Sequence, residues 1–513
     1  MLETRYPQLA FLLRMTEQKS APPLLQPLPE LNLEEKEILY LFGVGHYDKL
    51  KSWLHEKEER KLIYLEDDLQ ALHHIQDFSF LNDPQVHLRA LMPDAPIETF
   101  AEEIAHTFPF DQIEIAALKK SPRFSELKLL LQRKTTVQHA IFQERYYYPK
   151  LAANLFENFP QIPGSAYVNQ WENAFSHLPA IICGAGPSIE TILPQLAQLQ
   201  NRALIIAGGT AITALTRAGI IPHLGIALDP NPEEYHHLKE HQAGDMPLIF
   251  ASRLQPKALR LFSGKKIYYR SFTGGPLETW LEEQIGLTDP PLQKTAHKEA
   301  LSVTTAALNI AAHLGCKQIH LAGVDLAYTN GLRYPKGIKA FPAKSKRVRD
   351  EKLLRTNWKG EEIETQVKWV MEADWIAAFA KTHSDCVVTS CTNGGLCLGI
   401  PYKPLKPSTL PVQNIDVNRQ IKETILNIDI EAPLKKLSES LIRCKKFIEE
   451  LEGPLYDVAL LDLQAELAYP ICFKLFHEAV QKRFPTKAKQ IHYLKLAIKA
   501  YFEFKDACLS QSQ

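Results

Sequence analysis

Residues Pro179–Glu190 read Pro-Ala-Ile-Ile-Cys-Gly-Ala-Gly-Pro-Ser-Ile-Glu, and this stretch decides the fold. Its short apolar run is typical of a buried parallel strand, and open α/β sheets bind ligands at the carboxyl ends of such strands. Gly184 and Gly186 let the backbone approach a phosphate or a sugar, and Pro187 suits the first turn of a helix. Ser188 adds a hydroxyl among the free N–H groups of that helix start, which favour an anion. By itself the glycine pair is equally compatible with a plain tight turn.

The same pattern of strand, turn and helix returns further along the chain. The apolar run Ala203–Ala207 ends in Gly208-Gly209-Thr210, and the run Leu224–Leu228 ends in Asp229. Because the carboxyl ends of parallel strands meet at one edge of a sheet, these turns predict a single composite cleft. Asp229 is interpreted either as a helix cap or as a contact to the ligand.

A later segment adds to the same predicted edge. Ser302 and Thr304 lie at the start of an Ala-rich helix, and the next apolar strand ends in Gly323-Val-Asp325-Leu-Ala-Tyr328. Asp325 and Tyr328 therefore leave that strand at its carboxyl end. We expect Asp325 either to hold its loop together or to take a direct part in binding or catalysis.

Composition limits the class of protein. The chain has 513 residues, of which 45% are hydrophobic and 23% charged, as in ordinary soluble globular proteins. Its 59 basic and 59 acidic residues give no net charge to recruit nucleic acid or an anionic membrane. There is no signal-peptide pattern and no apolar run long enough to span a bilayer, so we expect a cytoplasmic protein. The eight cysteines are scattered without metal-ligand spacing, which predicts reduced thiols and no metal site.

Apolar strands alternate with helical segments in the middle of the chain, which predicts an α/β protein with a central, mostly parallel Rossmann-like sheet. Proline-rich segments and a change to helical periodicity mark the boundaries. The predicted parts are an N-terminal arm (1–30), a small N-terminal α/β domain (31–115), a helical connection (116–177), the central domain (178–402), a Pro-rich linker (403–411) and a C-terminal helical bundle (412–513).

The small N-terminal domain carries a second glycine turn, Gly43-Val-Gly45, followed about twenty residues later by Glu66-Asp67-Asp68. A dinucleotide or adenosylmethionine fold places a ribose-binding acid at that distance. The third glycine of the motif is missing, because residue 48 is Asp. This favours a domain that keeps the turn without a ligand over a nucleotide site.

Together the central motifs resemble the Maf (motility-associated factor) glycosyltransferase family, which shares its central domain with the archaeal MptE-like 6-hydroxymethylpterin diphosphokinases. Some of the pieces are also similar to bacterial CMP-sialic-acid transferases. The matching segments keep their order over about 180–400: Gly-Ala-Gly-Pro-Ser (184–188), Gly-Gly-Thr-Ala (208–211), Gly-Ile-Ile-Pro with Asp229 (219–229), Ser-Val (302–303), Gly-Val-Asp-Leu-Ala-Tyr (323–328), Asn357-Trp-x-Gly360 through Thr365, Trp375, and Thr392-Asn393-Gly394-Gly395.

The resemblance implies a sialyltransferase-like central fold and transfer of a nonulosonic, sialic-acid-like sugar from a CMP-activated donor to a protein serine or threonine. A flagellin-like or other protein is the implied acceptor, and no cofactor is certain. Carried over position by position, the resemblance implies that the nucleotide is bound by Gly184, Gly186, Pro187 and Ser188. It implies that the ribose and the sugar are lined by Gly209, Thr210 and Asp229. The rest of the implied pocket consists of Ser302, Thr304, Tyr328, Asn393 and Gly394.

The catalytic base is the weak part of the match. Relatives often carry a histidine shortly after the Asp-Leu-Ala-Tyr motif, but here none occurs between His320 and His383. Asp325 and His297 are the candidates, and His297 is alternatively a surface or packing residue. The basic run Lys344–Arg349 is interpreted as a solvated loop or as a lid that holds phosphate.

Two other functions stay open. An MptE-like diphosphokinase would move pyrophosphate from ATP to a pterin and would need Mg²⁺ held by carboxylates, for which Asp229 and Asp325 are the obvious acids. A non-catalytic nucleotide-binding or scaffold protein would keep the fold without a base. The large flanking domains favour the transferase.

Overall fold

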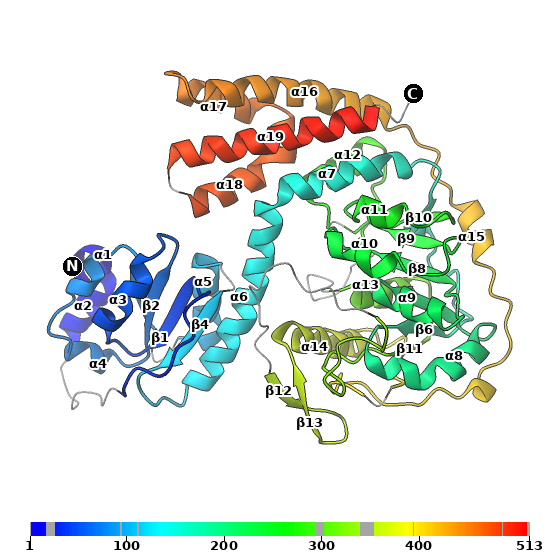
Figure 1. The fold of residues 1–513 in the computed structure, drawn as a ribbon, viewed down its shortest axis with the longest axis horizontal. Helices are drawn as coiled ribbons and strands as arrows, with labels where there is room; N and C mark the ends of the chain where they lie inside the picture. Colours follow the sequence, from blue (N-terminus) through cyan, green and yellow to red (C-terminus); the bar gives the residue numbers. More distant parts are fainter. Residues whose placement is uncertain are drawn as a thin grey trace. The chain divides into compact units, whose positions relative to one another are not determined.

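The computed structural model describes residues 2–16, 26–92, 95–109, 112–271, 273–292, 302–338, 353–392, 394–484 and 486–509. These residues form two compact units, one up to Glu144 and the other from Arg145 onward (Figure 1). Each unit contains a parallel sheet with helices packed on it. The predicted fold class, an α/β chain with a central parallel sheet, is confirmed.

The first unit is built on a four-stranded parallel sheet with the strand order β3-β2-β1-β4. Every residue of β1 is buried, as a strand that is covered on both faces requires. Its elements are α1 (Leu2–Arg5), α2 (Pro7–Met15), β1 (Ile38–Phe42), α3 (Tyr47–His55), β2 (Lys61–Glu66), α4 (Leu69–His73), β3 (Val86–Ala90), α5 (Ile97–Thr107) and β4 (Ile113–Ala117), and α6 (Phe124–Tyr146) follows.

Helix α2 lies within the predicted N-terminal arm (1–30). Pro7 occupies the first turn, where a missing N–H does no harm. Leu9 and Ala10 are buried, and Leu9 joins the apolar cluster that covers one face of the small sheet. The apolar side of this short helix thus ties the start of the chain to the first unit.

The second unit contains an eight-stranded sheet with the order β14-β11-β6-β7-β8-β9-β10-β5, and every pair of neighbours is parallel. An antiparallel pair, β12 (Leu353–Thr356) and β13 (Glu362–Thr365), lies outside it. The strands of the main sheet are β5 (Ala166–Tyr167), β6 (Ala180–Cys183), β7 (Leu204–Gly208), β8 (Leu224–Ala227), β9 (Leu248–Phe250), β10 (Lys266–Tyr268), β11 (Gln318–Ala322) and β14 (Val387–Ser390).

Helices cover both faces of this sheet. Successive strand residues alternate between two apolar clusters: Ile181 and Ile205 belong to one, Ile182 and Ile206 to the other. The covering helices are α7 (Tyr148–Asn158), α8 (Leu193–Leu199), α9 (Thr210–Arg217), α10 (Pro232–Leu238), α11 (Pro256–Leu259), α12 (Gly275–Gln284), α13 (Val303–His313) and α14 (Val367–Thr382).

The C-terminal helices share a core with the sheet. Leu437 and Leu441 of α16 belong to the same buried cluster as Ile181 and Ile205, and Figure 1 shows α19 running between α16 and α7. The chain reaches these helices through the proline-rich segment 403–411. They are α15 (Val417–Glu423), α16 (Glu431–Glu450), α17 (Tyr456–Ala465), a π-helical turn (Tyr469–Phe473), α18 (Lys474–Arg483) and α19 (Lys487–Leu509).

Within the part of the chain that the structure describes, no helix combines the length and the apolar character needed to cross a membrane.

Candidate functional site

The order of strands identifies where a ligand would bind. From β6 the chain proceeds through β7, β8, β9 and β10 on one side, and it then returns to place β11 on the other side of β6. The order therefore reverses between β6 and β11, and ligands of open α/β sheets bind outside the carboxyl ends of the strands at such a point. The loop Gly184–Ser188 leaves β6 there, and Gly323–Asp325 leaves β11 beside it.

Asp325 joins these two loops. Its Oδ2 accepts a hydrogen bond from the backbone N–H of Ser188 at 3.0 Å and one from Thr329 Oγ1 at 2.6 Å. The Ser188 hydroxyl donates to Oδ1. The side chain is buried, and burial raises its pKa although these three hydrogen bonds oppose the shift. The contacts are those of a carboxylate that holds loops together, and a direct contact of Asp325 with a ligand stays a prediction.

Glycines make this junction possible. A Cβ on Gly186 would overlap the Asp325 carboxyl, and one on Gly395 would overlap the Asp325 backbone. A Cβ on Gly394 would lie 2.9 Å from the Cβ of Ser188. The segment Gly394-Gly395 therefore lies against the loop after β6, as expected if both belong to the same edge of the sheet.

The second predicted glycine turn lies at the end of β7. Gly209 has φ +48° and is the N-cap of α9, without a side-chain cap for the first N–H groups. Thr210 begins this helix. A Cβ on Gly208 would overlap Val303, so the start of α13 packs directly on this turn. Ser302 and Thr304 therefore lie near Gly208, as expected for one edge.

Glu234 in α10 is a residue that the sequence did not single out. Its carboxyl lies against Gly209, where a Cβ would be 3.5 Å from Oε1. The side chain is 4% exposed, and Oε1 has no hydrogen-bond partner among the described residues. Burial and the nearby Asp229 carboxylate raise the pKa of Glu234 to about 8. His237 Nδ1 lies 3.9 Å from Oε2.

Asp229 lies two residues before the N-cap of α10 and does not itself cap the helix, although helix capping was one of its two interpretations. Its Oδ1 accepts hydrogen bonds from the backbone N–H and the side-chain amide of Asn231, both at 2.8 Å. Asn231 is the N-cap of α10, so Asp229 shapes the turn that leads into this helix. A contact between Asp229 and a ligand stays a prediction.

Ser302 caps α13 and also contacts a buried acid. Its hydroxyl accepts from the backbone N–H of Thr305 at 3.3 Å, which forms a capping box with the Thr305 side chain. The same hydroxyl donates to Glu372 of α14. Burial raises the pKa of Glu372 to about 7. Glu372 is the second carboxyl near the edge that the motifs did not reveal.

The loop after β11 passes over helices α9 and α10. Tyr328 donates its backbone N–H to the backbone carbonyl of Glu364 at 2.9 Å, and its ring lies 5.1 Å from that of Trp369. Further on, the ring of Tyr334 is 5.9 Å from that of His237, and Arg217 of α9 donates to the Gly337 carbonyl at 2.8 Å.

Arg333 of this loop brings a positive charge to the same place. Its guanidinium lies 5.6 Å from the centre of the Trp369 ring. Burial and then the Arg333 charge lower the pKa of His237, which shows that this charge acts on α10. Arg333 is exposed, and no carboxylate among the described residues pairs with it.

Some predicted positions lie outside the described residues. These are His297, Asn393 and the basic run Lys344–Arg349. Over the part of the chain that is described, no group of three or more His, Cys, Asp or Glu side chains is arranged to hold a metal ion.

In the first unit, the acids that a nucleotide site would use to bind a ribose have partners within the protein. Lys119 forms ion pairs with Glu66 and, at 2.8 Å, with Asp67, and Ser121 donates to Asp67 at 2.7 Å. Asp68 caps α4 by accepting from Gln70. These contacts accord with the favoured interpretation, a domain that keeps the glycine turn without a ligand.

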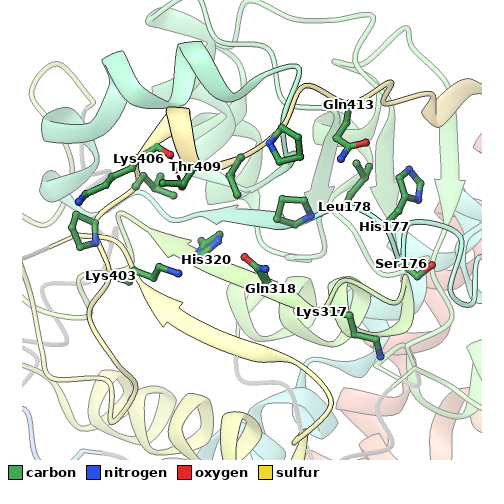
Figure 2. A pocket seen from close by; sticks show the side chains of 15 residues that line it. Ser176, His177, Leu178, Lys317, Gln318, His320, Lys403, Lys406, Thr409 and Gln413 are labelled. Carbon is green, nitrogen blue, oxygen red and sulfur yellow. Dashed lines mark hydrogen bonds between the residues drawn. The ribbon is translucent and has the colours of Figure 1, made fainter.

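A hollow of about 470 Å³ lies at the opposite, amino-terminal end of β6 and β11, next to the proline-rich segment (Figure 2). Its lining includes His320, whose Nδ1 lies 2.8 Å from Thr389 Oγ1 and whose pKa is lowered by burial and by Lys403 to about 4. Figure 2 shows the amino groups of Lys317 and Lys406 directed away from each other. The lysines do not converge on one point, so the carboxyl edge stays the candidate site.

Comparisons with known proteins bear on the central part of the chain. Residues 153–331 match the model of the 6-hydroxymethylpterin diphosphokinase MptE-like family. Among solved structures, a Maf glycosyltransferase from Magnetospirillum magneticum AMB-1 is similar with a TM-score of 0.48 and 14% identity, over 98% of this chain and 87% of that one. No curated protein sequence matches. The motifs of the sequence thus predicted a resemblance that is confirmed here: residues 153–331 are similar to the MptE-like family.

Proposed function

We propose that this chain is a glycosyltransferase that moves a nonulosonic, sialic-acid-like sugar from a CMP-activated donor to a serine or threonine of an acceptor protein. The proposal rests on one observation: the glycine turns after β6 and β7 lie at the reversal of strand order, near a loop that carries Arg333, which pairs with no carboxylate among the described residues. At this edge the start of α9 offers N–H groups without a side-chain cap, and Arg333 offers a guanidinium, to a phosphate.

The chemistry of such a transfer suits this edge. The acceptor oxygen bonds to the anomeric carbon, and the bond from that carbon to the phosphate oxygen breaks. Its electron pair leaves with CMP, so negative charge grows on the phosphate. The uncapped N–H groups at the start of α9 and the Arg333 side chain are fixed donors for that charge. In this proposal the loop Gly184–Ser188 holds the nucleotide, and the turn at Gly209 faces the sugar.

A second candidate is transfer of diphosphate from ATP to a pterin, the activity named for the family whose model matches residues 153–331. Asp229 and Glu234 are close enough for the charge of the first to raise the pKa of the second. In this candidate, the two carboxylates would hold the Mg²⁺ that accompanies ATP.

The proposal is tested by replacing Arg333 with Gln and titrating the protein with CMP in a calorimeter. A hydrogen bond to a charged group is worth about 1.5–3 kcal/mol, so we expect the affinity for CMP to fall by about 10- to 100-fold. The matched control is Arg419→Gln, because Arg419 is an exposed arginine of α15 whose partner is Glu423. This variant should bind CMP as the original chain does.

Parallel titrations separate the candidate functions. CMP and CMP-N-acetylneuraminic acid should bind without added metal if the chain is a transferase. Binding of ATP only in the presence of Mg²⁺, together with a pterin, would support the diphosphokinase instead. A chain that binds none of these compounds would be a scaffold, and the transferase proposal would then be wrong.

A further inference from the structure

Glu234 is exceptional among the buried acids of the second unit. The carboxyl of Glu278 accepts from the Ser252 hydroxyl and from the Gly274 N–H at 2.9 Å, and that of Glu282 is paired with Arg270 at 2.8 Å. Among the described side chains, Glu234 Oε1 is the one buried carboxylate oxygen without a hydrogen-bond partner. Proteins rarely leave such an atom unsatisfied, and a site for a ligand or substrate explains it.

The position of Glu234 matches that explanation. Its helix, α10, begins just beyond the carboxyl end of β8, and the side chain turns inward to the Gly209 turn at the end of β7. Glu233, the preceding residue, is exposed. One of two adjacent acids is thus buried at the edge of the sheet where the proposed donor sugar would lie.

We propose that Glu234 is the group that accepts the proton of the attacking hydroxyl, the base that the sequence motifs lack. This inference rests on the proposed transferase function. As the acceptor oxygen bonds to the anomeric carbon, its proton passes to Glu234 Oε1, and the phosphate departs as CMP with the electron pair of the broken bond. Glu234 then gives the proton to solvent, which restores the carboxylate.

The surroundings of Glu234 raise its pKa to a value at which it can act as a base near neutral pH. Burial and the Asp229 charge bring the pKa of Glu234 to about 8, and a base acts best when its pKa lies near the working pH. The carboxylate form grows as the pH rises toward that value, so turnover should rise with it. Among the described residues, the other charged or titratable groups around α10 include Glu233, Tyr235, His236 and His237 on the helix itself, Arg333 and Tyr334 on the loop after β11, Arg217 of α9, which is paired with Glu240, and Lys257 of α11.

The test compares Glu234→Gln with Glu233→Gln in the full chain. Gln keeps the shape of the side chain but cannot take the proton, while the Glu233 variant removes a neighbouring exposed carboxylate from the same helix. Each protein is titrated with CMP in a calorimeter and assayed for CMP release from CMP-N-acetylneuraminic acid, with a Ser/Thr peptide as acceptor, from about pH 5.5 to about pH 9.5. Circular dichroism reports whether the fold is kept.

We expect Glu234→Gln to bind CMP normally, to release CMP about 10²- to 10⁴-fold more slowly and to lose the rise of rate with pH. Glu233→Gln should behave as the original chain. Glu234→Asp, which keeps a shorter carboxylate, should recover part of the rate, and this recovery would not follow from a purely structural role.

Other outcomes overturn the inference. If Glu234→Gln binds CMP and turns the donor over at the original rate with the original pH profile, Glu234 is not the base, although the transferase function stands. If the unaltered chain neither binds CMP nor releases it from the donor, the proposed function is wrong, and the role of Glu234 is wrong with it.

Discussion

A buried carboxyl group destabilises a protein unless donors surround it, and the second unit shows both situations. Glu282 accepts from Arg270 and from the Tyr268 hydroxyl at 2.7 Å, and these bonds oppose burial and the Glu278 charge, which together raise its pKa to about 8. Glu234 Oε1 has no hydrogen-bond partner among the described residues, and burial and the Asp229 charge raise its pKa to about 8 as well. Glu234 therefore keeps its proton in the folded state at pH values where an exposed glutamate has lost it.

The raised pKa of Glu234 predicts how the stability of the protein depends on pH. The folded pKa of Glu234 is about 8 and its ordinary value is 4.5, so the folded state binds one more proton between these values. Rising pH should therefore reduce the free energy of unfolding across this range. Glu234→Gln removes the effect, and its stability relative to the original chain should increase from about pH 5 to about pH 9 by a few kcal/mol, at about 1.4 kcal/mol per pKa unit.

Urea unfolding at these two pH values measures the difference, with Glu233→Gln as the control. An equal stability difference between Glu234→Gln and the original chain at both values would show that Glu234 does not titrate abnormally. This measurement needs no substrate, so it is independent of the transferase function.

The sequence predicts some of these residues better than others. Asp325 could be found because it ends an apolar strand within a recognisable motif, and Gly186 because the turn after such a strand needs a glycine. Glu234 could not be found from the sequence, because two adjacent acids in the first turn of a helix, such as Glu233-Glu234, are ordinarily both exposed. Its burial depends on packing against the Gly209 turn, a tertiary contact that no local pattern contains.

At the scale of elements, the edge of the sheet is held together by turns that approach one another closely. The strands and turns from β6 to β8 follow the predicted order, because apolar runs ending in Gly or Asp are a local signal. The sequence could not show that the later Gly-Gly turn contacts Asp325, since the pairing of β11 with β14 joins distant parts of the chain. Gly395 has no side chain, and this leaves room for the backbone of Asp325.

The variant Gly395→Ala tests this close approach against Gly331→Ala. Both glycines have positive φ, +84° and +74°, so each alanine meets the same backbone strain of about 1–2 kcal/mol. At Gly331 the space around a Cβ is open, whereas at Gly395 the Cβ overlaps Asp325. We expect Gly395→Ala to lose about 1–3 kcal/mol more stability than Gly331→Ala. Equal losses in urea unfolding would contradict the contact.

At the scale of the whole molecule, one of the two apolar clusters of the second unit includes residues of the C-terminal helices. The sequence predicts a helical bundle beyond the proline-rich linker, and helices do follow it. Helical periodicity shows which residues of a helix are buried but not which surface buries them. Here Leu441 of α16 lies in the cluster that also contains strand residues of the main sheet.

Adjacent residues of α16 provide a matched test. Leu441 is buried, while Ile442 is 51% exposed. Leu441→Ala should cost about 2–5 kcal/mol and Ile442→Ala less than about 0.5 kcal/mol. Because the core is shared, hydrogen exchange of peptides from β7 and β8 should accelerate in the Leu441 variant. Unchanged exchange in those strands would mean that the helices unfold separately from the sheet.

The order of strands also affects how the nascent chain folds. As the ribosome releases the second unit, β5 emerges first, but its partner β10 follows only after β6, β7, β8 and β9. The edge at β6 stays open until β11 is made, and the shared apolar cluster is complete only when α19 has emerged. Long-range pairing of this kind slows folding and leaves apolar strands exposed during synthesis. Chaperones that shield such strands should therefore raise the yield of folded protein during translation.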